Sequence, residues 1–154
     1  MARLLVILIA AAVVALLAAQ FRADRHEHRA AEAVDLAAKG RASPEAVTQG
    51  LDDLRKARRF YADGSALRHE AALLLFAGRF DRAHTAARQL VDMEPENFDG
   101  WVAVNLAYPD RGGPQARLAR ARALQLNPLG ASSITALETQ PVLQQAYRRA
   151  RRSP

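Results

Sequence analysis

The chain has 154 residues, of which 50% are hydrophobic and only 6% aromatic, and its formal net charge is +6. This length allows one domain with an appendage. The absence of cysteine excludes a disulfide scaffold, a thiolate-held iron–sulfur cluster, a cysteine-ligated zinc site and a cysteine nucleophile. Alanine and arginine dominate the composition, and both favour helices, so we expect an all-α fold.

The N-terminus is strongly apolar. Leu4 to Phe21 contains Gln20 as its one polar residue. At ~1.5 Å per residue such a helix spans roughly 27 Å, close to the ~30 Å hydrocarbon core of a bilayer. We therefore predict that residues 1–22 are a transmembrane anchor. A cleaved signal peptide is the alternative, although no clear small-residue cleavage site follows the apolar run.

The side of the membrane on which the rest of the chain lies stays open. Arg22, Arg25 and Arg29 follow the apolar run, and their number favours a cytoplasmic location. However, a short basic tail such as Arg3 before a signal-like run is also how anchors of exported bacterial domains begin.

Residues 23–154 are predicted to form paired helices. No breaker interrupts the chain between Leu4 and Lys39, so the anchor should continue into the first helix of the domain. Ser43 and Pro44 form a helix start, and Pro95 ends a later helix. The expected helices of this part cover about 24–39, 44–62, 66–77, 80–93, 98–108, 114–126, 133–138 and 141–152.

Equivalent residues recur at a spacing of 33. Pro95 and Pro128 each end a helix, and Ala83 and Ala116 each lie 12 residues before that proline. A helix–turn–helix unit of this period resembles the tetratricopeptide repeat. The units fall near 26–62, 64–97 and 98–130, and the middle one matches the family pattern best, through Leu67, Ala71, Leu74, Gly78, Phe80, Ala83, Ala87, Leu90 and Pro95.

The third unit departs from the pattern. Asn105 stands where the family has a small residue, and the loop 109–113 replaces the short turn. We therefore expect its two helices to pack less tightly than those of the middle unit.

The resemblance implies a short α–α superhelix of two to three hairpins with a capping helix at 141–152. Such superhelices bind a protein or peptide partner on a concave face. The residues expected to line that face are Arg68, Ala72, Phe76, Val102 and Leu106. Phe76 and Leu106 could equally be core residues. The implied function is a scaffold or assembly factor in a bacterial cell membrane, with a partner that is itself membrane-associated.

A second hypothesis starts from the basic C-terminal third, because residues 111–154 hold eight arginines against Glu138 as their one acidic residue. An anionic lipid surface could bind there, although a solvated arginine-rich end explains the charge as well. Nucleic acid is not expected, because no aromatic residues interleave with the arginines. The residues concerned are Arg117, Arg120, Arg148, Arg149, Arg151 and Arg152.

No catalytic motif is found, and we expect no enzyme, cofactor or metal site. The chain lacks a P-loop and any Gly-rich phosphate motif. His26 and His28 are two apart on a helix and point away from each other, and the adjacent Asp52 and Asp53 diverge in the same way. An enzyme with a site built from scattered residues is kept only as a third hypothesis.

Overall fold

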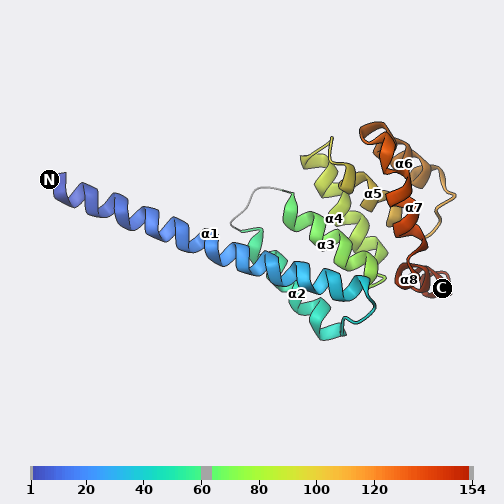
Figure 1. The fold of residues 1–154 in the computed structure, drawn as a ribbon, viewed down its shortest axis with the longest axis horizontal. Helices are drawn as coiled ribbons and strands as arrows, with labels where there is room; N and C mark the ends of the chain where they lie inside the picture. Colours follow the sequence, from blue (N-terminus) through green and yellow to red (C-terminus); the bar gives the residue numbers. More distant parts are fainter. Residues whose placement is uncertain (1, 60–63, 153–154) are drawn as a thin grey trace.

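The structure is a computed structural model that describes residues 2–59 and 64–152, without the side-chain surroundings of 2–11, 15, 16 and 23. The described residues form an all-α fold (Figure 1). Its helices are α1 (Ala2–Ala38), α2 (Pro44–Ala57), α3 (Ser65–Phe76), α4 (Phe80–Met93), α5 (Phe98–Leu106), α6 (Pro114–Leu126), the short 3₁₀ turn η1 (Pro128–Gly130), α7 (Ala131–Thr139) and α8 (Pro141–Ala150). The all-helical fold and its helix order confirm the sequence prediction.

Consecutive helices pack as pairs: α1 with α2, α3 with α4, and α5 with α6. The first helix of each pair also packs against the first helix of the next, so that α1, α3 and α5 lie side by side. Glu27 lies near His69, and Ala33 and Leu73 both flank Gly50, so α1 and α3 run in the same direction. The three hairpins therefore form one continuous stack.

The helix ends follow from local chemistry. Ser43 caps α2 by accepting a hydrogen bond from the amide of Ala46, and Asn97 caps α5 by accepting one from Gly100. The turn between α3 and α4 depends on Gly78, whose φ of 72° lies in the left-handed region. The expected caps and turns therefore form.

The core consists of leucines and alanines from facing helices. Leu54, Leu67, Leu74 and Leu90 are fully or almost fully buried. Small residues allow close approach within and between hairpins, since a Cβ on Gly50 of α2 would lie 2.9 Å from the Cβ of Ala33 in α1 and 2.9 Å from Cδ2 of Leu73 in α3. Stacking therefore buries apolar surface that one hairpin would leave exposed.

The N-terminal part of α1 projects away from the other helices (Figure 1). We call residues 2–25 the projecting segment; the next residue, His26, contacts Asp53 of α2. Within the described part of the chain, no helix combines the length and apolar character needed to cross a membrane. The side chains of 2–11, 15 and 16, on which much of the predicted anchor at 1–22 rests, lie outside that description.

Helix α8, predicted to cap the last hairpin, instead crosses the turns of the earlier ones. A Cβ placed on Gly40 would lie 3.1 Å from Val142, and a Cβ placed on Gly78 would lie 3.4 Å from Ala146. The buried ring of Tyr147 stacks on Phe80 with centroids 4.7 Å apart. The apolar face of this amphipathic helix therefore covers the ends of the hairpins that lie opposite the projecting segment.

The expectation of loose packing between α5 and α6 is wrong. Asn105 is 2% exposed, and its Nδ2 donates a 2.9 Å hydrogen bond to the carbonyl of Ala116, which is fully buried. An asparagine replaces the small residue without opening the hairpin, because its amide binds a backbone oxygen across the interface.

Candidate functional site

The five residues predicted to line a concave face all line one pocket of about 170 Å³, which we call the trough. Arg68, Ala72 and Phe76 share one face of α3, and Val102 and Leu106 share one face of α5. Because α3 and α5 lie side by side in the same direction, these two faces meet. The trough is completed by Leu75, Asp99, Ala103, Leu137 and Leu143.

The trough is apolar inside and charged at one end. Val102 and Leu106 are 5% and 3% exposed, so they form its buried floor, and Phe76 is half-buried at its edge. Phe76 and Leu106 are thus both core and lining residues. Arg68 and Asp99 are exposed and lie 3.6 Å apart, in the first turns of α3 and α5.

The C-terminal helices close the other end. Leu137 of α7 and Leu143 of α8 both line the trough beside the ends of α3 and α5. Tyr147 fixes α8 there by donating a hydrogen bond from its hydroxyl to the carbonyl of Leu106. The guanidinium of Arg111 lies 4.1 Å from the centre of the same ring.

Sequence reasoning missed these closing residues, since no pattern shows that α8 folds back. Asp99 could have been found, because it precedes Val102 by three residues and Leu106 by seven, on the same helix face.

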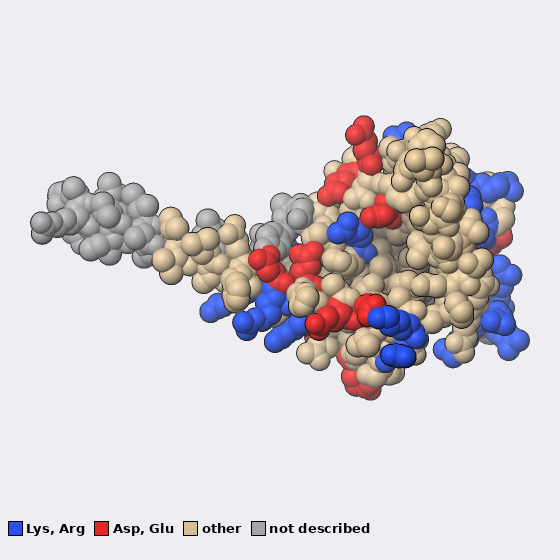
Figure 2. Space-filling model, in the orientation of Figure 1, with Lys and Arg blue, Asp and Glu red and all other residues tan. Residues whose placement is uncertain are grey.

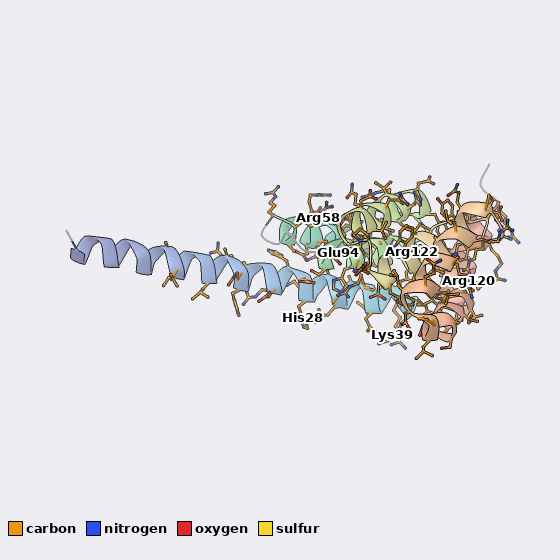
Figure 3. The ribbon with its side chains drawn as sticks, turned by 90° about the horizontal axis from the view of Figure 1, so that it is seen from above. His28, Lys39, Arg58, Glu94, Arg120 and Arg122 are labelled. Carbon is orange, nitrogen blue, oxygen red and sulfur yellow. The ribbon has the colours of Figure 1, made fainter. Side chains whose placement is uncertain are left out.

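Several arginines of the basic C-terminal third have polar partners, and binding of an anionic surface there stays a prediction. Arg120 pairs with Glu138, and Arg117 and Arg151 donate to the carbonyls of Gly112 and Pro109. Arg149 also has a partner, whereas Arg148 and Arg152 are exposed. Figure 2 shows the blue side chains of this region at the end farthest from the projecting segment, and Figure 3 places Arg120 there.

His26 and His28 contact different carboxylates. Nδ1 of His26 lies 2.7 Å from Oδ1 of the buried Asp53, whereas His28 faces Glu32 at 3.4 Å. The prediction that His26 and His28 diverge is confirmed. Asp52 and Asp53 diverge as well, because Asp52 accepts from Arg55.

Burial shifts the pKa values of three side chains. It lowers the pKa of His69, helped by Arg68 and opposed by Glu27, and lowers that of His84, helped by Arg88. Burial also raises the pKa of Tyr147 to about 12, against the opposing effect of Arg111. None of these groups has the nucleophile–base arrangement of a catalytic site.

Among the residues that the structure describes, no three histidine or carboxylate side chains are grouped closely enough to hold a metal ion. Comparisons of the chain with protein-family models, with curated proteins and with solved structures found no match. The chain is therefore assigned as an all-helical protein of packed antiparallel helix pairs, and the trough is its candidate site.

Proposed function

We propose that the chain is a membrane-anchored, tetratricopeptide-like adaptor that binds a partner polypeptide in the trough. The observation that carries this proposal is that apolar side chains from α3 and α5 meet in one pocket, which has Arg68 and Asp99 at one end. We call this charged end the mouth of the trough. At about 170 Å³ the trough is smaller than the roughly 300–1,000 Å³ pockets that bind small molecules, which favours a single side chain as its occupant. The occupant we infer is such a side chain, carried beside a carboxylate that Arg68 binds.

The repeat-like arrangement supports binding on this face. The first helices of successive hairpins line the inner side of a tetratricopeptide superhelix, and the trough lies between two such helices, α3 and α5. The matched 33-residue spacing of Pro95 and Pro128 supports the same family.

The anchor is supported by the apolar run from Leu4 to Phe21. Within it, Val13, Val14, Leu17 and Phe21 are 49%, 65%, 57% and 64% exposed. A row of exposed apolar side chains on a projecting helix is costly in water and favourable in lipid. We place the chain in a membrane for this reason.

The direction of the mouth indicates where the partner comes from. Arg68 and Asp99 lie at the N-terminal ends of α3 and α5, and α1, which runs parallel to α3, projects beyond that same end. Helix α8 closes the opposite end. A partner segment therefore enters from the anchor side, as the part of a membrane protein next to the bilayer would.

Site-specific photo-crosslinking tests the proposal. A photoreactive residue in place of Ala72, inside the trough, should give a discrete adduct with another polypeptide in native membranes. The same residue in place of Arg82, an exposed position of α4, is the matched control and should not.

The charge at the mouth gives a second readout. Arg68→Glu should weaken the Ala72 adduct severalfold, whereas Arg82→Glu, with an equal charge change, should leave it intact. The proposal fails if position 72 gives no adduct, or if positions 72 and 82 give the same adducts.

A further inference from the structure

Helix α1 carries a row of exposed arginines where the projecting segment joins the globular part. Arg22, Arg25 and Arg29 are spaced by three and four residues, which places them on one face of α1. All three are exposed. Figure 2 shows basic side chains gathered at this junction, and Figure 3 places His28 in the same stretch of α1. We call these three residues the arginine row.

We infer that the arginine row binds the phosphate groups of acidic phospholipids beside the anchor. This inference rests on the proposed membrane anchoring and adds the chemistry of the lipid surface. The sequence hypothesis placed the contact with anionic lipid in the C-terminal third, whereas this inference places it at the opposite end of the protein.

The position of the row along α1 fits the headgroup layer. Arg22 directly follows Phe21, the last apolar residue of the run, and Arg29 lies ~12 Å along the helix from Phe21. Side chains on a helix lean toward its N-terminus, so all three arginines lean toward the apolar run. Their long stems let the guanidinium groups reach back to the interface.

Phe21 adds an independent feature of such an interface. Its ring is 64% exposed, and the guanidinium of Arg25 lies 5.4 Å from the ring centre. An aromatic ring at the end of an apolar run, next to a cation, is the combination found at the boundary between hydrocarbon and headgroups.

The basic surface of the arginine row stays on α1, because the groove between Arg29 and α2 is also lined by Glu45, Asp52 and Asp53. By contrast, Arg111 and Arg120 of the C-terminal third are engaged with Glu138. The arginine row is therefore better placed for a membrane surface than the more numerous arginines at the far end.

Flotation of the full chain with vesicles tests the inference. The probes are vesicles of phosphatidylcholine alone and vesicles with 30% phosphatidylglycerol, chosen as an acidic lipid. Each arginine near an acidic surface strengthens partition about 5-fold, so the wild type should prefer acidic vesicles by up to roughly 100-fold at low salt. High salt should remove most of that preference.

Two variants separate the row from general charge. Replacement of Arg22, Arg25 and Arg29 by glutamate should abolish the preference for acidic vesicles, whereas replacement by lysine should retain it. As a matched control, the same change at Arg117, Arg148 and Arg152 should leave the preference largely intact.

The possible failures are distinguishable. If the wild type floats with neither vesicle, the proposed anchor is wrong, and the arginine row falls with it. If it floats equally with both vesicles, or if the far-end variant loses the preference as fully as the row variant, the anchor stands and the arginine row is overturned. Circular dichroism of each variant confirms that the fold is retained.

Discussion

Tyr147 contributes to the attachment of α8 to the hairpin stack, and Tyr147→Phe tests its contribution. Tyr147 is 4% exposed, and its hydroxyl donates to the carbonyl of Leu106 in the last turn of α5. Phenylalanine keeps the ring on Phe80 but leaves that carbonyl without this donor. We expect the free energy of unfolding to fall by about 1–2 kcal/mol at pH 7.

The pH dependence sharpens the test. Burial raises the pKa of Tyr147 to about 12, whereas an unfolded tyrosine titrates near 10. A pKa raised by folding stabilises the protein fully below pH 10, and this contribution is lost as the pH rises toward 12. The loss reaches roughly 2 kcal/mol at pH 12, whereas phenylalanine cannot titrate. The advantage of the wild type over Tyr147→Phe should therefore shrink to about zero by pH 12.

Urea unfolding followed by circular dichroism, from pH 7 to pH 12, measures both quantities. Tyr108→Phe is the matched control, since its hydroxyl lies 3.0 Å from Nε2 of His84 at a half-buried position, and it should cost under about 1 kcal/mol. If Tyr147→Phe is as stable as the wild type at pH 7, or if its deficit is constant up to pH 12, then α8 is not held as described.

Three further substitutions, one of them with a matched control, test the packing by urea unfolding at pH 7. Gly78→Ala should cost about 1–2 kcal/mol, because alanine is strained at a φ of 72°; an unchanged midpoint would show that the turn can relax. His26→Ala should cost roughly 1–3 kcal/mol because it leaves the buried Asp53 without its partner, whereas His28→Ala, at an exposed pair, should change stability by under about 0.5 kcal/mol; equal effects would contradict this. Leu143→Ala should cost about 2–5 kcal/mol and enlarge the trough; a smaller loss would mean that α8 collapses into the space.

Local signals in the sequence predicted the helices well. Pro44 and Pro114 open α2 and α6 as expected, and α4 has its predicted bounds of Phe80 and Met93. Proline and capping residues act within one helical turn, so the local sequence is enough to predict where these helices begin. The five residues that the family resemblance implied for the concave face all line the trough, although their role in binding a partner stays a prediction.

Contacts between distant residues were not predictable in this way. The pairing of His26 with Asp53 joins residues 27 apart, and that of Tyr147 with Leu106 joins residues 41 apart. Nothing in the periodicity of α8 distinguishes a helix that caps the stack from one that crosses its turns, since both need one apolar face. The error over Asn105 has a similar origin, because whether a buried amide finds a backbone partner depends on the neighbouring hairpin.

The fold-back of α8 restricts what the trough can bind. An open tetratricopeptide groove accepts an extended segment that passes through from end to end, but here Leu137 and Leu143 close one end and Tyr147 holds the closure. If the trough binds the proposed partner, we expect the partner to insert a short apolar group beside Arg68 and Asp99. Because α1 is one continuous helix from Ala2 to Ala38, the direction of the mouth is coupled to that of the projecting segment. With that segment in a bilayer, the trough would face the membrane, and partners would be selected by their position as well as by their sequence.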